Sequence, residues 1–241
     1  MSSCLICRFT QDFQILNFEN AREEIVCINC GSTWRDRKLI YLVLKSTGVH
    51  PEIFDKYLLD YSHRIIGIGD SFHVQGALGS KFNYVNTFLD RFPRIDIEQI
   101  PDNFEKFDVV TCSDVLEHVI NLEKAIIGLE KLVKKGGCVV ISAPMVDTGV
   151  TLEHYPDIQS FTENPDKSID WKDTKGEIFN YSSPIFHGGE GHVLEVRIIS
   201  RTHLEQKLIE HGFIIRSSEA FDENLGIFQL ENEGFILAVK E

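Results

Sequence analysis

The sequence predicts an α/β protein with a doubly wound, mainly parallel sheet, preceded by a small cysteine-rich module. Over residues 62–241, short apolar segments typical of buried strands alternate with helix-like segments, which is the pattern of repeated strand–helix–strand units. Ahead of them, residues 1–34 contain two closely spaced cysteine pairs. The predicted organisation is therefore a module over 1–34, a helical linker over 35–61 and an α/β domain over 62–241.

Composition and charge narrow the class of protein. Of the 241 residues, 43% are hydrophobic and 25% are charged, which is a globular balance for one sizeable domain with a small appendage. Residues 1–48 carry six basic and five acidic residues, whereas the remainder carries 18 basic and 32 acidic ones. A nucleic-acid groove needs clustered positive charge, so a nucleic-acid partner is disfavoured. Without an apolar run of ~18 residues or a secretory signal, a cytoplasmic protein without membrane contact is expected, and its oligomeric state stays open.

The cysteines of the N-terminal module have the spacing of a metal site. Cys4 and Cys7 form one C-x-x-C pair, and Cys27 and Cys30 form another after 19 intervening residues. This spacing allows both thiolates of a pair to take adjacent corners of a tetrahedron around Zn²⁺. Four such ligands close the coordination shell, so a structural zinc ribbon is predicted; a redox dithiol or buried thiols are the alternatives. The apolar residues expected to wrap the metal are Phe9, Phe13, Ile15, Phe18 and Ile25.

The elements after the module follow from apolar spacing and from signals for helix ends. Strands are predicted over residues 64–68, 84–88, 107–112, 138–143, 213–216 and 235–239. Helices are predicted over residues 36–45, 51–59, 71–81, 121–134 and 200–211. The clearest helix is 121–134, because its apolar residues share one face, Asn121 can cap its start and Gly136–Gly137 can end it. Residues 147–195 break the alternation with aromatic and histidine residues, which indicates a substrate-side insertion.

Three segments resemble motifs of S-adenosylmethionine-dependent methyltransferases of the Rossmann-like type. In chain order they are RIIGIGDS, RIDIEQIPDNFEKFDVVTCSDVLEHV and LEKLVKKGGCVVISAP. The cysteine pairs and CGSTWRDR also resemble a subset of bacterial methyltransferases with a zinc ribbon before the catalytic domain. The resemblance covers about residues 62–240. It implies a seven-stranded Rossmann-like sheet, S-adenosylmethionine as the cofactor, and methyl transfer to oxygen or nitrogen of a small-molecule or glycan-type acceptor.

The same resemblance implies which residues bind the cofactor. The glycine-containing loop after the first strand would approach the methionine portion and the ribose, and the residues after the fourth strand would lie near the sulfonium. Asp96 and Ile97 would lie beside the adenine. The sequence departs from the family pattern at two positions. In the loop, Gly67 stands where an acidic residue is usual. At the end of the second strand, Thr87 replaces the acid that usually binds the ribose. The implied cofactor residues are Gly67, Ile68, Gly69, Asp70, Ser71, Thr87, Asp96, Ile97, Ser113, Asp114 and His118.

A hydroxyl acceptor must lose its proton as it attacks the methyl group, and a histidine with a pKa near ~6.5 suits this work at neutral pH. The candidate bases are His154 and His187, followed by His118, which with Glu117 is expected to begin the helix after the fourth motif. The possible orienting carboxylates are Glu153, Glu190 and Glu195. Each of these histidines also has an ordinary role in packing or capping as its alternative.

Two other functions fit parts of the sequence. The altered glycine loop favours a catalytically weak binding module that keeps the fold and uses the ribbon to hold a partner protein. A nicotinamide-dependent dehydrogenase fits less well, because it needs G-x-G-x-x-G and GIGDSF lacks the third glycine. Arg35 and Arg37 could bind an anionic group or form salt bridges to the acidic domain, and Trp34 is expected to pack the ribbon against that domain.

Overall fold

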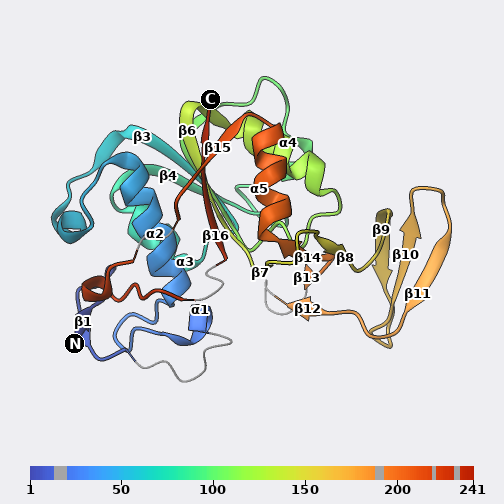
Figure 1. Cartoon of the computed structure of the whole chain (residues 1–241), viewed down its shortest axis with the longest axis horizontal. Helices are drawn as coiled ribbons and strands as arrows, with labels where there is room; N and C mark the ends of the chain where they lie inside the picture. Colours follow the sequence, from blue (N-terminus) through green and yellow to red (C-terminus); the bar gives the residue numbers. More distant parts are fainter. Residues whose placement is uncertain (14–20, 188–192, 219–220, 231–233) are drawn as a thin grey trace.

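The structure is a computed structural model that describes residues 1–13, 21–187, 193–218, 221–230 and 234–241. At its centre lies a twisted sheet with helices on both faces (Figure 1). The strands of this sheet are β3 (Asp60–Ile68), β4 (Phe82–Thr87), β5 (Phe107–Ser113), β6 (Val133–Ser142), β15 (Phe213–Arg216) and β16 (Phe235–Lys240). Each of the six predicted strands therefore corresponds to an observed one, with ends that differ by a few residues.

The strand order confirms the predicted fold class. Over the described residues the sheet is six-stranded, in the order β15-β16-β6-β5-β3-β4. The neighbours from β4 to β6 pair in parallel, whereas β16 runs antiparallel to both β6 and β15. The implied seventh strand does not form in the described stretch after β4. There Pro93, which cannot donate a ladder hydrogen bond, lies between Phe88 and Arg94, which form only an isolated bridge.

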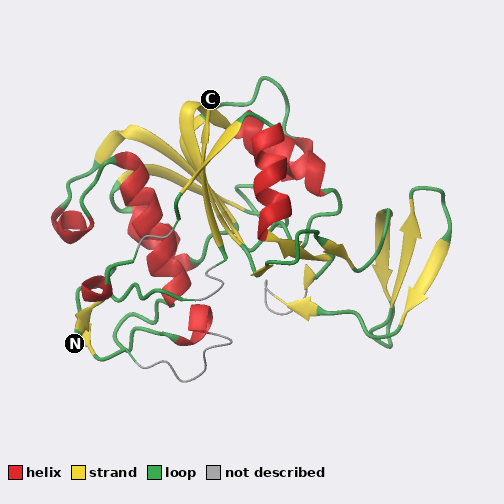
Figure 2. Cartoon of the chain, viewed as in Figure 1, coloured by secondary structure: helices red, strands yellow, loops and turns green. Residues whose placement is uncertain are grey.

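Helices cover both faces of the sheet, as Figure 2 shows. One face carries α2 (Trp34–Thr47) and α3 (Phe72–Gly79), and the other carries α4 (Leu122–Leu132) and α5 (Arg201–Glu210). Because successive side chains of a strand point to opposite faces, Ile65 and Val109 pack in the core under α2 while Ile66 and Val110 pack in the core under α4. The apolar runs of the sequence are therefore buried on both sides.

Local signals fix the helix ends. Thr33 and Asp36 form a capping box at the start of α2, Gly48 ends it at φ 73°, and the Asn121 side chain accepts from the Lys124 backbone at the start of α4. The predicted end of the latter helix is wrong, because α4 stops at Leu132 and the next strand begins at once. Gly136–Gly137 lies inside β6 instead. A Cβ on Gly137 would lie 2.8 Å from the Asp108 carbonyl oxygen, so the close approach of β5 requires glycine there.

The predicted insertion forms a small unit that projects from the central sheet (Figure 1). Its antiparallel strands are β9 (Ile158–Glu163), β10 (Ile169–Asp173) and β11 (Ile178–Tyr181). Short strands join this unit to the body: β7 (Met145–Val146), β8 (Leu152–Glu153), β12 (Phe186–His187), β13 (Val193–Leu194) and β14 (Arg197–Ser200). A separate apolar cluster around Tyr155 and Ile169 holds the insertion together.

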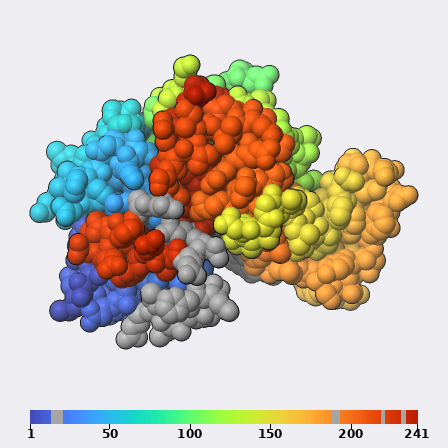
Figure 3. Space-filling model, in the orientation of Figure 1, coloured from blue at the N-terminus to red at the C-terminus, as the bar shows by residue number. Residues whose placement is uncertain are grey.

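The N-terminal module packs against the C-terminal part of the chain. It contains β1 (Ser2–Ser3), β2 (Thr10–Gln11) and α1 (Ala21–Glu24); the 3₁₀ helices η1 (Pro51–Lys56) and η4 (Glu223–Leu225) lie nearby. Figure 3 shows the C-terminal segment that includes η4 against the N-terminal residues. Trp34, which is fully buried, donates to the Phe228 carbonyl and meets the Phe235 ring edge-on, so its predicted packing role is confirmed.

Some predictions concern residues that the structure does not describe. Ile15 and Phe18 of the ribbon and Glu190 of the insertion lie outside the described residues. Among the residues that are described, no helix is both long and apolar enough to cross a membrane.

Candidate active site and metal site

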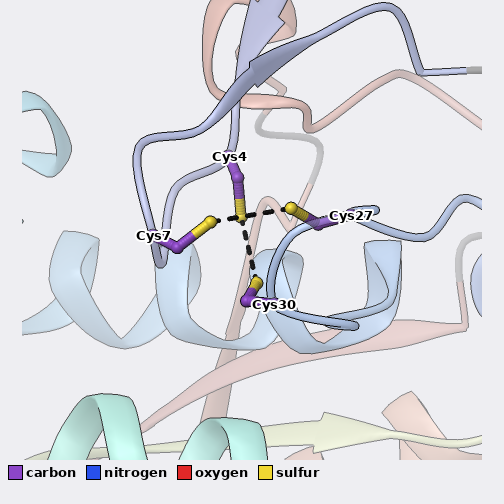
Figure 4. Close-up of side chains that lie close together, drawn as sticks. All are labelled: Cys4, Cys7, Cys27 and Cys30. Carbon is purple, nitrogen blue, oxygen red and sulfur yellow. Dashed lines mark hydrogen bonds between the residues drawn. The ribbon is translucent and has the colours of Figure 1, made fainter.

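The four cysteines of the N-terminal module converge on one point (Figure 4). Their sulfur atoms all lie within 4.8 Å of one another, with 3.8 Å between Cys4 and Cys30 and 3.6 Å between Cys7 and Cys27. A tetrahedron with metal–sulfur bonds near 2.3 Å has edges of about 3.8 Å. The cysteines are free thiols rather than disulfides, so the arrangement fits a four-coordinate zinc ion.

A buried arginine supports this cysteine site from behind. Arg37 is fully buried, and its guanidinium donates to the carbonyl oxygens of Ser32, Ile25 and Gly226. These contacts therefore tie the second cysteine pair to the C-terminal segment. The guanidinium binds backbone carbonyl oxygens rather than a carboxylate. The Ser32 hydroxyl lies 3.2 Å from the Cys30 sulfur, within reach of a thiolate as a hydrogen-bond donor.

The loop between β3 and α3 lies beside the end of β5. Gly69 has φ 72°, and a Cβ there would lie 2.9 Å from Val115 Cγ2 and 3.2 Å from the Ser113 carbonyl oxygen. Only glycine fits such a turn without strain. Ser71 caps α3 and donates from its hydroxyl to Asp36 Oδ1 at 2.6 Å. The strand end near Gly69 and the strand end near Ser113 therefore meet, as the resemblance implied.

The Asp70 side chain lies beside Gly67, where the sequence departs from the family pattern. A Cβ on Gly67 would lie 2.4 Å from Asp70 Oδ2, so the Asp70 carboxylate occupies the space beside the glycine. This carboxylate accepts hydrogen bonds from Tyr84 and Thr111. Burial raises its pKa to about 6, although the two hydrogen bonds act to lower it. Its Oδ1 is buried without a partner among the described residues. Thr87, at the end of β4, donates its hydroxyl to the Gly67 carbonyl.

The pair expected beside the adenine follows the loop after β4. Asp96 caps η2 (Ile97–Gln99), accepting from the Glu98 backbone and the Gln99 side chain. The Ile97 side chain is buried in the core between the sheet and α4. Its carbonyl oxygen would lie 1.9 Å from a Cβ on Gly128, so the helix approaches the loop closely.

Two arginines from the N-terminal part of the chain reach the end of β5. Arg22 Nη2 lies 3.1 Å from Asp114 Oδ1, and Arg35 Nε lies 3.3 Å from Asp114 Oδ2. Arg35 also donates from Nη1 to the Ser113 hydroxyl at 2.9 Å and from Nε to Glu23 at 2.5 Å. We name Arg22, Glu23, Arg35 and Asp114 the arginine cluster. For Arg35, the salt bridge to the acidic domain, one of its two predicted roles, is confirmed.

Asp114 is held tightly at the end of the strand. Its backbone has φ 51°, which is uncommon for a non-glycine residue, and its amide donates to the Ser142 carbonyl at 2.7 Å. The Ser142 hydroxyl donates to the carboxylate at 2.9 Å. Although burial opposes it, the charges of Arg35 and Arg22 keep the pKa of Asp114 below its ordinary value. The carboxylate is therefore ionised at neutral pH.

The prediction that Glu117 and His118 begin a helix is wrong. They lie in a turn, and α4 begins only at Leu122. The Glu98 carboxylate accepts from the Ile120 backbone at 2.7 Å, which holds the chain before the helix. Arg197 is buried and donates to carbonyl oxygens of the same turn, including that of Leu116 at 2.8 Å. The turn is thus fixed by side chains from distant parts of the chain.

The three candidate histidines come together around Glu195. Its two oxygens lie 2.8 Å from His154 Nε2 and 2.7 Å from His187 Nε2. The ring of His118 lies 4.7 Å from that of His187, and its Nδ1 lies 2.9 Å from the Leu194 carbonyl oxygen. We name His118, His154, His187 and Glu195 the histidine cluster. Pairing of β12 with β13, and of β8 with β14, brings His154, His187 and Glu195 together.

Of the three candidate orienting carboxylates, Glu195 alone among the described residues contacts the histidines. Glu153 instead accepts from Arg197 Nε at 2.9 Å. Burial lowers the pKa of His118, so this imidazole is neutral at pH 7. Because its Nδ1 faces a carbonyl oxygen and so carries the proton, its Nε2 keeps a free lone pair.

Glu117 is a functional candidate that the sequence reasoning did not single out. It is 1% exposed, and neither carboxyl oxygen has a hydrogen-bond partner among the described residues. Burial, reinforced by the charge of Asp114, raises its pKa to about 8. His118 Nε2 lies 3.8 Å from Glu117 Oε1, and Arg22 and Glu195 are also near enough to affect its charge. A buried carboxyl without a partner is costly to the fold, which points to a role in binding or proton transfer.

The chain belongs to the methyltransferase domain family. A family model described as a methyltransferase domain matches residues 47–217, which is more than half of the chain. This range includes the loop after β3, the turn with Glu117 and the histidine cluster. Among curated proteins, none matches the sequence.

Solved structures with a similar fold include known methyltransferases. The chain is similar to an S-adenosylmethionine-dependent methyltransferase from Clostridium acetobutylicum, with 14% identity, a TM-score of 0.50, and coverage of 87% of this chain and 92% of that one. It is also similar to an amino pentose methyltransferase from Micromonospora echinaspora, with 13% identity, a TM-score of 0.48, and coverage of 88% and 93%. At 14% identity, the likeness to the first of these structures shows the fold. The predicted Rossmann-like fold and the enzyme class, an S-adenosylmethionine-dependent methyltransferase, are confirmed.

Proposed function

We propose that the protein transfers the methyl group of S-adenosylmethionine to an oxygen or nitrogen atom of a small-molecule or glycan-type acceptor. The observation that carries the proposal is Glu195 with an imidazole on each oxygen, near the unpartnered carboxyl of Glu117. When bound, the cofactor supplies a methyl group already activated on a sulfonium. The protein therefore has to align the acceptor, exclude water and accept a proton.

In this proposal the histidine cluster removes the proton of the acceptor. If Nε2 of His154 and of His187 each donate to Glu195, the Nδ1 atom of each ring keeps the lone pair that a base needs. Glu195 then has the role of the carboxylate in a His–carboxylate pair, because it fixes the tautomer and stabilises the imidazolium that forms. His118, kept neutral by burial, is the third candidate base.

Aromatic side chains of the insertion supply a surface for the acceptor. The Tyr155 ring lies 6.1 Å from that of His154 and 5.7 Å from that of Tyr181, so aromatic contacts continue outward from the histidine cluster. Trp171 stacks on Phe179 at 4.6 Å, and Phe179 and Tyr181 are 41% and 48% exposed. Exposed aromatic faces with polar edges suit an acceptor that is partly apolar, such as a sugar ring or a small aromatic molecule.

We also propose that Cys4, Cys7, Cys27 and Cys30 bind a structural zinc ion. Sulfur separations close to a tetrahedral edge and the serine hydroxyl beside Cys30 support it. Such a closed shell leaves no coordination position for an acceptor. The metal would therefore shape the N-terminal module rather than take part in methyl transfer.

The test has a binding step and a turnover step. Calorimetry with S-adenosylhomocysteine on the full chain should give saturable binding. A panel of amine and hydroxyl acceptors with S-adenosylmethionine labelled in its methyl group should then give labelled product with at least one acceptor. Binding without turnover on any of them would favour the alternative of a catalytically weak module.

Variants then assign the base. With the acceptor found in the panel, His154→Asn and His187→Asn should each lower kcat, and the base is the histidine with the larger loss. His211→Asn is the matched control, because His211 also contacts a glutamate, Glu123 at 2.8 Å, but lies at the end of α5 away from the cluster. Equal activities of all three variants would contradict the assignment of a histidine base.

A further inference from the structure

The two arginines of the arginine cluster come from outside the matched family domain. It lies at the ends of β5 and β6, where ligands of doubly wound sheets bind, but its cations come from the N-terminal part of the chain. Arg22 belongs to α1, between the two cysteine pairs, and Arg35 belongs to the first turn of α2. The matched family domain begins only at residue 47, so neither arginine belongs to it.

The charges of the cluster are balanced and reachable. Two guanidinium groups face two carboxylates, those of Glu23 and Asp114. The side chains of Arg22, Arg35 and Asp114 are 16%, 17% and 26% exposed, so they are largely desolvated but still accessible to a ligand. Arg22 Nε is buried without a partner among the described residues. The cluster thus offers both charge signs to a ligand.

We propose that the arginine cluster binds the amino-acid tail of the cofactor, with Arg22 and Arg35 on its carboxylate and Asp114 on its ammonium group. This inference rests on the proposed function. The tail is a zwitterion at neutral pH, and a pair of cations beside a pair of anions matches it in both signs. Guanidinium groups bind carboxylates through two parallel hydrogen bonds, which also fixes orientation. The module with the cysteine site would then supply part of the cofactor site.

The structure explains how the module can hold these arginines in place. Ala21 and Ile25, at the ends of the segment that carries Arg22, are buried in the core under α2. Arg37 donates to the Ile25 carbonyl at 2.8 Å, which fixes that segment close to Cys27. Thr33, three residues after Cys30, forms the capping box at the start of α2. The capping box therefore sets the position of Arg35 in the first turn of that helix. Each arginine is thereby fixed by packing that originates at the cysteine knuckles.

The test compares two probes on the full-length, metal-containing protein. S-adenosylhomocysteine carries the amino-acid tail, whereas 5′-methylthioadenosine keeps the thioadenosine part and lacks the tail. For Arg35→Gln and Arg22→Gln, calorimetry should show S-adenosylhomocysteine affinity lower by roughly tenfold to a hundredfold, because each loses a charge-assisted pair. Affinity for 5′-methylthioadenosine should stay within about twofold, which also shows that the variant is folded.

Arg8→Gln is the matched control within the same module. Arg8 contacts Asp55 at 3.1 Å rather than the strand ends, so its loss should leave both affinities unchanged. Arg35→Lys keeps the charge without the planar fork and should give an intermediate S-adenosylhomocysteine affinity.

The outcomes separate this inference from the proposed function. Should wild-type protein bind both probes while Arg35→Gln and Arg22→Gln keep the wild-type ratio of the two affinities, the inference is wrong and the enzyme assignment stands. An equal loss for both probes also overturns it, because the arginines would then act on the whole site. Wild-type protein that binds neither probe would overturn the proposed function and this inference together.

Discussion

The arginine cluster and the histidine cluster both lie within electrostatic reach of Glu117, but they balance charge in different ways. In the arginine cluster each carboxylate contacts a guanidinium, a group that keeps its charge at neutral pH. In the histidine cluster one carboxylate is shared by two imidazoles. Guanidinium groups suit a ligand of constant charge, whereas imidazoles suit the transfer of a proton.

The two clusters also depend on different parts of the fold. The arginines are held by the module with the cysteine site, whereas the histidines are held by strand pairs of the insertion and by the buried Arg197. Conditions that disrupt one support should therefore leave the other cluster in place.

Removal of the metal should disrupt the arginine cluster and spare the histidine cluster. Structural zinc contributes about 10–16 kcal/mol to the folding of small zinc-finger peptides, and a module of this size has little other core. Hydrogen exchange should show faster exchange over residues 1–34 after chelation, with the strands around Glu195 still protected. One zinc per chain by mass spectrometry of the native protein is the accompanying check. Equal protection of residues 1–34 with and without metal would contradict the structural role.

Glu195→Gln should break the histidine cluster alone. Loss of the carboxylate that both histidines contact should lower kcat about 10²–10⁴-fold, because this carboxylate orients the base and stabilises the imidazolium that forms. Affinity for S-adenosylhomocysteine should not change, because the arginine cluster is untouched. Glu123→Gln, which removes the surface partner of His211, is the matched control and should keep full activity. A parallel loss of cofactor affinity in Glu195→Gln would show that the two clusters are not separate.

Glu117→Gln should change how stability depends on pH. The folded pKa of about 8 lies above the ordinary 4.5, so the unfolded chain releases this proton first as the pH rises. Between these values the folded protein binds more protons, and Glu117 should therefore lower the free energy of unfolding by about 1.4 kcal/mol per pH unit. In denaturant titrations from pH 5 to 8, the free energy of unfolding should therefore fall by about 1.4 kcal/mol less per pH unit in the variant than in wild-type protein.

The same variant should be more stable than wild-type protein at pH 8, since a neutral amide avoids the cost of a buried charge. Glu24→Gln, which changes an exposed residue of α1, should keep the wild-type slope. A wild-type slope in Glu117→Gln would mean that another group dominates the titration.

Gly69→Ala should have the smallest of these effects and should report on the turn beside the arginine cluster. Alanine at φ 72° costs roughly 1–2 kcal/mol, as it would at Gly48, where φ is 73°. At Gly69 the added Cβ also meets Val115 Cγ2 at 2.9 Å, whereas nothing lies within 4 Å at Gly48. Urea denaturation should therefore show Gly69→Ala to be less stable than Gly48→Ala by about 1 kcal/mol.

The fold class, the cysteine cluster and most strand positions could be predicted from residue spacing alone. These depend on local spacing: cysteines two residues apart, apolar runs that fit a strand, and caps such as Asn121. Prediction from local spacing failed at Gly136–Gly137. This glycine pair was expected to end a helix, but it lies within β6, where Gly137 allows β5 to approach closely. Such prediction also failed at Glu117 and His118, because the turn there is fixed by Arg197, some 80 residues later in the chain.

Which charged side chains meet depends on long-range packing. Arg22 and Asp114 are 92 positions apart, and His154 and Glu195 are 41 positions apart. Nothing in the local sequence distinguishes Glu195, which joins two histidines, from Glu153, which pairs with Arg197. Likewise, Asp70 folds back beside Gly67 only because Tyr84 and Thr111 offer hydroxyl groups from neighbouring strands. Hydrogen bonds and charges act through space at a few ångströms, so partners brought together by packing leave no signal in residue spacing.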